Sequence, residues 1–256
     1  MAQTLFLPKK IYFKTGCTPV ALRELSEVYG CRRALLVTDA KLYRNGTASQ
    51  VIDLLRKKGI RTAEIFTISD PVKLSELHAA VPKLNEFAPD AILGVGGGNA
   101  LSAAKLLGAL YENPELDLTD ETALPAYTKA GLALLAADLS SGGQSSMLAE
   151  FEDDAGERHT VCSRNLLPEI SVTDADYTKY LTPDELRAEA AKTLERAKAV
   201  RSRETGSEFT DGMLTEAIAL VEKYTDDAAQ GCPKAREHLA NAANLAAIAD
   251  GNVPKA

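Results

Sequence analysis

The chain has 256 residues and a net charge of −7 at pH 7, with 45% hydrophobic and 25% charged residues. This size allows one large domain or two modest ones, each with a real core, and the composition is that of an ordinary globular protein. The negative charge argues against a partner that is nucleic acid or an anionic membrane surface. Neither a signal peptide nor an apolar run long enough to cross a bilayer is present, so we expect a cytoplasmic protein.

Strand-like and helical segments alternate through the first half of the chain. We predict strands over residues 10–14, 33–38, 62–67, 90–95, 132–136, 147–152 and 171–173. We predict helices over residues 18–29, 47–58, 72–87 and 100–111, the first with Thr18 as its N-cap. Residues 153–157 are expected to connect the last two strands. Such alternation predicts a parallel sheet with helices on both faces.

From Pro183 onward the chain shows little β signal. Helical runs are predicted over residues 183–201, 210–224 and 233–249. We therefore predict an α/β domain over residues 1–182 and an all-helical domain over residues 183–256.

Gly96, Gly97 and Gly98 lie between a predicted strand and a predicted helix. In this arrangement unpaired backbone N–H groups and the positive end of the helix dipole face one point, which binds phosphate or pyrophosphate well. Glycine lets the backbone approach the ligand, because a Cβ would hold its oxygens away. The alternative interpretation is a tight turn that binds nothing.

Asp39 follows another predicted strand, so it lies at the same sheet edge as the glycines. Ligands of parallel sheets collect at this edge. An acidic side chain there accepts hydrogen bonds from ribose hydroxyls and repels a 2′-phosphate, which favours NAD over NADP. Alternatively, Asp39 caps the next turn. The polar loop over residues 138–146 either lines a ligand cleft or is a surface turn.

Ten short segments share a pattern with one known family. They cover residues 10–14, 19–25, 28–31, 37–39, 89–92, 96–98, 103–105, 110–114, 208–212 and 234–237. The chain resembles the iron-containing (group III) alcohol dehydrogenases, most closely the alcohol dehydrogenase half of bifunctional aldehyde–alcohol dehydrogenases. This resemblance implies a dehydroquinate-synthase-like fold, in which a Rossmann-type NAD-binding domain precedes a helical, metal-binding domain. It also implies that the three glycines cradle the pyrophosphate and that Asp39 meets the adenosine ribose.

The cofactor loops depart from the family pattern. The family's glycine loop continues Ser-x-x-Asp, where this chain has Asn99 and Ser102. Its second cofactor loop reads Pro-Thr-Thr-x-Gly-Thr-Gly-Ser-Glu, and only Gly142 agrees in residues 136–144. Asp138 adds a negative charge that costs about 1 kcal/mol or more near a phosphate. The predicted cofactor-binding residues are Asp39, Gly96, Gly97, Gly98, Asn99, Ser102, Lys105, Asp138, Ser141 and Gly142.

The metal ligands of the family also have no counterpart. The family places an Asp and a His four residues apart on the first helix of its second domain. Those positions fall on Lys192 and Arg196, or on Thr193 and Ala197 if the register shifts by one. Two further family histidines would lie beyond Ala256, so we expect a truncated, shortened helical domain without iron or zinc.

Three hypotheses follow. The favoured one is a degenerate relative that binds NAD(H) but lacks metal-dependent hydride transfer between alcohol and aldehyde. The second is a non-catalytic assembly or regulatory protein, a homodimer or a hetero-oligomer with a related dehydrogenase, that uses residues 10–14 as an edge strand. The third is an active NAD-dependent alcohol dehydrogenase. A shortened helical domain would expose apolar faces at Leu239, Leu245 and Ile248, be covered by a partner, or repack as three helices.

Overall fold

The computed structural model describes residues 4–254, so the outer ends of both predicted domains, 1–3 and 255–256, lie outside it. Six strands form one parallel sheet in the order β1-β8-β5-β4-β2-β3. They are β1 (Lys10–Tyr12), β2 (Arg33–Thr38), β3 (Arg61–Ile65), β4 (Ala91–Gly96), β5 (Gly131–Ala136) and β8 (Ile170–Thr173). The predicted parallel sheet is confirmed, with β1 at its edge as expected.

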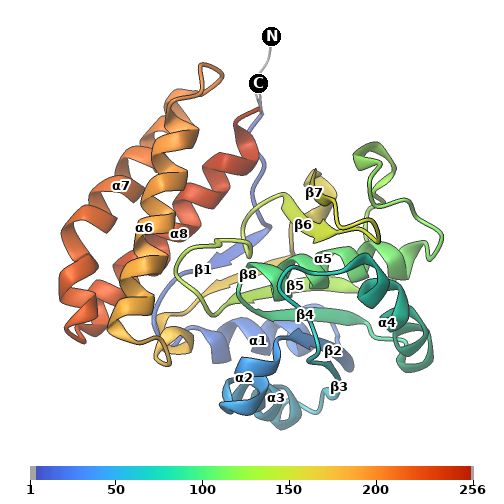
Figure 1. Ribbon diagram of the computed structural model, residues 1–256. Coiled ribbons are helices and arrows are strands. Elements are labelled where there is room, and N and C mark those ends of the chain that lie inside the picture. Colours follow the sequence, from blue (N-terminus) through green and yellow to red (C-terminus); the bar gives the residue numbers. More distant parts are fainter. Residues whose placement is uncertain (1–3, 255–256) are drawn as a thin grey trace.

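Helices cover both faces of this sheet (Figure 1). They are α1 (Thr18–Glu27), α2 (Ala40–Arg44) and α3 (Thr47–Lys57) on one face, and α4 (Leu74–Phe87) and α5 (Gly98–Glu112) on the other. Leu35 and Val37 of β2 join the core of α4 and α5, whereas Ala34 and Leu36 join that of α1 and α3. Because side chains alternate along a strand, both faces of β2 are buried.

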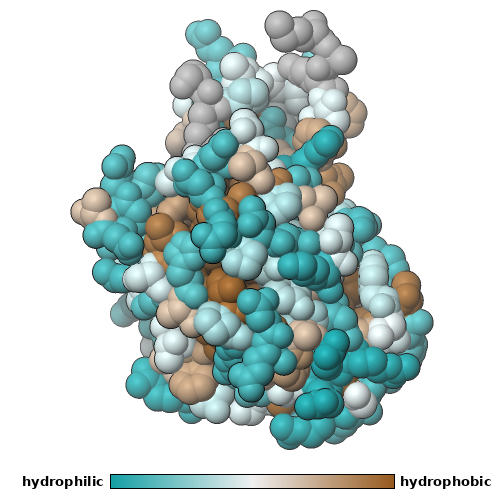
Figure 2. Space-filling model, turned by 90° about the vertical axis from the view of Figure 1, so that its right-hand side faces the viewer, coloured by the Kyte–Doolittle hydropathy of each residue, from teal (hydrophilic) through white to brown (hydrophobic). Residues whose placement is uncertain are grey.

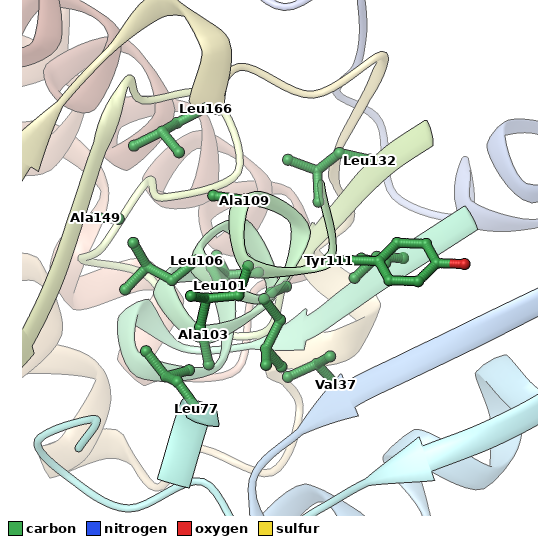
Figure 3. Close-up of a cluster of buried hydrophobic side chains, with 14 of the residues drawn as sticks. Val37, Leu77, Leu101, Ala103, Leu106, Ala109, Tyr111, Leu132, Ala149 and Leu166 are labelled. Atoms are coloured by element: carbon green, nitrogen blue, oxygen red, sulfur yellow. The ribbon is translucent and has the colours of Figure 1, made fainter. Parts of the chain in front are cut away.

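Helix α5 is the centre of one of these two cores. Every residue from Ala100 to Tyr111 is buried. In Figure 3 the helix is surrounded by side chains of β2, α4, β5, β6 and the turn after β7, namely Val37, Leu77, Leu132, Ala149 and Leu166. This packing fixes the N-terminus of α5 at the carboxyl edge of the sheet.

An antiparallel hairpin of β6 (Leu148–Glu152) and β7 (Arg158–Cys162) corrects one prediction. Residues 153–157 are its turn, and they do not lead directly to β8 as expected. Within β7 only Val161 is buried. The strand therefore lacks the apolar alternation from which it could have been predicted.

The start of α1 corrects another prediction. Thr18 is the first helical residue, and the N-cap is Cys17, which makes no side-chain cap bond. The Thr18 hydroxyl instead donates a hydrogen bond to Asp174 at 2.7 Å, and the same carboxylate accepts the Gly16 N–H at 2.9 Å. The residue that organises this helix start thus lies 156 positions away in the sequence.

Three helices follow the sheet and pack around a core of their own. They are α6 (Pro183–Arg201), α7 (Glu208–Ala229) and α8 (Pro233–Asn252). Leu239 and Ile248 are only 1% and 4% exposed, and Leu245 is partly buried. The structure therefore shows a packed three-helix unit, and the domain division at residues 182/183 remains an interpretation of it.

Across residues 4–254, no helix combines the length and apolar character needed to span a membrane. On the face drawn in Figure 2, apolar side chains form small patches between hydrophilic ones.

Candidate functional site

A cleft of about 810 Å³ opens beyond the ends of β2, β4 and β5 and faces α6. The glycine turn before α5, the loop after β5 and one side of α6 form much of its wall. The predicted binding residues that line it are Asp39, Gly97, Gly98, Asn99, Ser102, Asp138 and Ser141. Gly96, Lys105 and Gly142 are not part of this lining. The structure thus brings most, but not all, of the predicted residues together.

The N-terminus of α5 opens onto the cleft. Gly97 is the N-cap and Gly98 the first helical residue. The first N–H groups of a helix have no acceptor inside the helix, and the positive end of its dipole lies at the same place. Gly96 serves the turn itself, because a Cβ there would lie 2.6 Å from the Cβ of Ala100.

Asp138 places a carboxylate against this helix end. Its Oδ2 accepts a hydrogen bond from the N–H of Gly98 at 3.2 Å. Its Oδ1 accepts hydrogen bonds from the hydroxyl of Ser141 at 2.8 Å and from the Ser141 N–H at 3.3 Å. Burial raises the pKa of Asp138 to about 6, and Glu189 adds to that rise, whereas the Ser141 hydrogen bonds and Arg196 lower it. The acidic side chain thus contacts the helix end that would bind a phosphate.

Asp39 and Ser102 have structural partners and also line the cleft. Asp39 caps α2, a helix that was not predicted, by accepting the Leu42 N–H at 2.8 Å. The capping interpretation of Asp39 therefore holds, and its ribose contact stays a prediction. The Ser102 hydroxyl accepts the Glu150 N–H at 3.1 Å and so ties α5 to β6.

Lys105 and Gly142 have structural roles inside the protein, which their contacts define. The Nζ of Lys105 donates hydrogen bonds to the carbonyls of Ser146 and Leu148, both at 2.7 Å, and the side chain is 1% exposed. Burial lowers the pKa of Lys105 to about 7. A Cβ at Gly142 would lie 2.3 Å from the Cβ of Ala247, so this loop packs directly on α8. The cofactor contacts of both residues remain predictions.

Arg196 and Glu189 of α6 hold the loop that carries Asp138. The Nη1 of Arg196 donates to the carbonyls of Ser140 and Ser141, both at 2.6 Å. Lys192 forms an ion pair with Glu189 at 3.0 Å, and the Ser140 hydroxyl donates to the same Glu189. These contacts join the loop after β5 to the helical unit.

The cleft lining carries a negative excess. Its basic residues are Lys41, Lys192 and Arg196, and its acidic residues are Asp39, Asp70, Asp138, Glu150, Glu185, Glu189 and Asp250. The ion pairs are Lys41–Glu185, Lys192–Glu189 and Arg196–Asp250. The remaining charge opposes a ligand with several negative charges.

Sequence analysis missed most of these acidic residues. Glu189 lies three residues before Lys192 on α6, a spacing that places both on one helix face, so this signal was available. Asp250 comes from the last helix and Asp70 from the loop after β3. No local pattern links them to the glycine turn.

Comparison with known proteins identifies the family. Residues 8–175 match the model of the iron-containing alcohol dehydrogenases. The chain belongs to this family. It is 30% identical to the bifunctional aldehyde-alcohol dehydrogenase AdhE of Escherichia coli over 263 residues, which cover 96% of this chain. The chain spans 29% of the length of that relative.

Solved structures share the fold. A 1,3-propanediol oxidoreductase superimposes with a TM-score of 0.92 at 21% identity, over 99% of this chain and 67% of that one. A sulfoacetaldehyde reductase from Bifidobacterium kashiwanohense, solved in complex with NAD+, gives a TM-score of 0.86 at 19% identity, over 97% and 67% of the two chains. The predicted dehydroquinate-synthase-like fold is therefore confirmed.

The family name implies iron, but the two α6 positions at which the family resemblance expects metal ligands cannot supply them. Lys192 and Arg196 occupy these positions, and a protonated amine or guanidinium has no lone pair to offer a metal. Thr193 and Ala197 are buried. Among residues 4–254, the acidic, histidine or cysteine side chains that gather closely enough around one point are Asp153, Glu157 and His159. They belong to the β6–β7 hairpin and are not part of the cleft lining.

Proposed function

We propose that this iron-containing alcohol dehydrogenase family member binds NAD(H) in the cleft, with the pyrophosphate at the N-terminus of α5. One observation carries the proposal: the glycine turn between β4 and α5 opens onto a cleft of about 810 Å³ at the carboxyl edge of the parallel sheet. This is where dinucleotides bind in such sheets, and the volume lies within the range of cofactor pockets. The NAD+ complex of the similar sulfoacetaldehyde reductase supports it.

The residues of the cleft have distinct roles in this proposal. Gly97 and Gly98 let the ligand approach the backbone, and Asn99 supplies an amide at the same helix end. Asp39 accepts hydrogen bonds from ribose hydroxyls with the oxygen that does not cap α2. The bound cofactor would supply hydride transfer.

We also propose that this chain, acting by itself, does not carry out metal-dependent alcohol oxidation. The support is the pair of cations, Lys192 and Arg196, on the α6 wall. Purified protein incubated with NAD+ and ethanol, butanol or propane-1,2-diol should produce no NADH, with or without added Fe²⁺ or Zn²⁺. Turnover that rises with added metal would contradict this proposal.

An NADH titration followed by the fluorescence of the cofactor tests the binding site. The chain contains no tryptophan, so protein emission interferes little. We expect a saturable signal that Gly97→Asp abolishes, because a Cβ at Gly97 would already lie 3.1 Å from the Asp138 carboxylate. The matched control is Gly212→Asp, on the exposed side of α7 with open space around its Cβ position. No binding by wild type at millimolar NADH, at pH 8 and at pH 5.5, would exclude the site.

A second function, self-association, is favoured by the apolar surface around β1. The exposed large apolar side chains on and near this strand and α1 are Leu7, Phe13, Val20, Val28 and Tyr29. Strand β1 is an edge of the sheet, and its Lys10 pairs with Glu24 of α1 at 2.6 Å. An open edge strand beside apolar side chains suits pairing with another copy of the same chain. We therefore propose a homodimer through β1.

Sedimentation velocity tests this interface. Wild type should sediment as a dimer at micromolar concentration, and Phe13→Asp should shift it to the monomer. The control is Phe209→Asp on α7, because Phe209 is 72% exposed but lies in the helical unit. A monomeric wild type would rule the proposal out. A dimer broken only by Phe209→Asp would place the interface elsewhere.

A further inference from the structure

Asp138 joins the glycine turn to the loop that follows β5. Its carboxylate accepts the Gly98 N–H on one oxygen and the hydroxyl and N–H of Ser141 on the other. A Cβ at Gly97 would lie 3.1 Å from its Oδ2, and one at Gly98 would lie 3.2 Å from the Cβ of Ser141. The two glycines therefore leave room for this loop as well as for a ligand.

This contact uses the group that a phosphate would use. The N-terminus of a helix is stabilised by one nearby anion, which neutralises the dipole and accepts its first N–H groups. A second anion about 4 Å from the first weakens binding about fivefold in bulk water, and by several hundredfold at the lower dielectric of a protein surface. An ionised Asp138 and a pyrophosphate therefore compete for the same N–H groups and the same dipole at the N-terminus of α5.

We propose that Asp138 is an internal anion that competes with the phosphate of a ligand for the N-terminus of α5, and so sets the affinity of the cleft for dinucleotides. This inference rests on the proposed NAD(H) site. The pyrophosphate binds fully only when Asp138 is neutral or turns away together with its loop. Ligands that bring less negative charge to this point are favoured over diphosphates.

The charged and titratable groups around Asp138 come from several elements. They are Glu189, Lys192 and Arg196 on α6, Tyr180 in the segment before α6, and Asp39 after β2. Lys192 and Arg196 already pair with carboxylates, so neither is dedicated to Asp138. Acidification from pH 8 to pH 5.5 protonates a carboxyl of raised pKa and should tighten NADH binding to the wild type.

The test compares wild type with Asp138→Asn, which removes the charge, and Asp138→Ala, which also removes the bulk. Asp70→Asn is the matched control, because it removes a carboxylate from the same lining. NADH binding is followed by fluorescence and inorganic pyrophosphate binding by calorimetry at pH 8, with circular dichroism to verify folding. We expect both Asp138 variants to bind each probe at least about tenfold more tightly than wild type. Asp70→Asn should change affinity by less than about threefold, because it is Asp138, and not Asp70, whose carboxylate accepts the Gly98 N–H.

The two probes separate this inference from the NAD(H) proposal. If the Asp138 variants gain affinity for pyrophosphate while no protein binds NADH, Asp138 has the inferred role and the NAD(H) site is wrong. If wild type and both Asp138 variants bind pyrophosphate equally, or none binds it, the role of Asp138 is overturned whatever NADH does. An Asp70→Asn gain as large as that of Asp138→Asn would also overturn it, since general cleft charge would then be the cause. In Asp138→Asn, the tightening of NADH binding at pH 5.5 should disappear.

Discussion

The loop after β5 should tolerate no side chain at Gly142. This residue has a φ of +56°, and a Cβ would lie 2.3 Å from the Cβ of Ala247 and 2.4 Å from the carbonyl oxygen of Ala243. Carbon atoms pack best at about 3.5–4.0 Å, so either α8 or the loop must move by more than 1 Å. Left-handed backbone costs an alanine about 1–2 kcal/mol, and overpacking costs about 1–3 kcal/mol more. We expect Gly142→Ala to lower the free energy of unfolding by about 2–5 kcal/mol.

Urea denaturation followed by circular dichroism measures this loss. The control is Gly59→Ala, because Gly59 has a φ of +73° and open space around its Cβ position. It isolates the backbone term of about 1–2 kcal/mol. Equal losses in the two variants would refute the reasoning, because they would show that the loop does not press on α8. The melting temperature of Gly142→Ala should fall by roughly 4–20 °C, at about 2–4 °C per kcal/mol for a chain of this size.

Three further predictions concern buried or capping side chains. Burial holds the pKa of Lys105 near 7, so above that pH the folded chain binds fewer protons than the unfolded chain. The stability of wild type relative to Lys105→Met, measured by urea denaturation, should therefore rise from pH 7 toward pH 10. The rise is at most about 1.4 kcal/mol per pH unit. The raised pKa of Asp138 changes stability with pH in the opposite direction, because the folded chain binds more protons than the unfolded chain between about pH 4 and about pH 6. Relative to Asp138→Asn, wild type should lose stability as the pH rises from about 4 to about 6, with the same limiting slope. A stability difference that does not change with pH would contradict the burial of Asp138. Asp39→Ala should lower the free energy of unfolding by about 1 kcal/mol, because α2 loses the cap that accepts the Leu42 N–H. Asp39→Asn keeps an oxygen acceptor and should lower it little in the same assay.

The sequence was sufficient for the parallel sheet, for all of its helices except α2 and for the glycine turn. The sheet and the helices depend on local apolar periodicity, and the turn depends on glycines between a strand and a helix. It was not sufficient for features that depend on distant partners. Thr18 donates to Asp174, and the capping role expected of it passes to that distant carboxylate. Strand β7 was missed because its polar sequence pairs with β6 at the surface.

The candidate site shows the same division. Asp39, Gly97, Gly98 and Asp138 were placed together from strand ends and family motifs, and all line one cleft. The bond from the Gly98 N–H to Asp138 depends on the path of a loop, which spacing does not determine. Lys105 faces two carbonyls inside the protein because α5 is buried on all sides. A composition rich in alanine and leucine also occurs in helices that keep one face exposed, so it did not predict this burial.

The loop over residues 138–146 contacts three helices, α5, α6 and α8. At its start, Asp138 accepts the Gly98 N–H of α5. In its middle, the carbonyls of Ser140 and Ser141 accept hydrogen bonds from Arg196 of α6, and Gly142 packs against α8. The same loop therefore lines the cleft at one end and contacts both α6 and α8 further along, so it is the segment through which the cleft lining and the three-helix unit are joined.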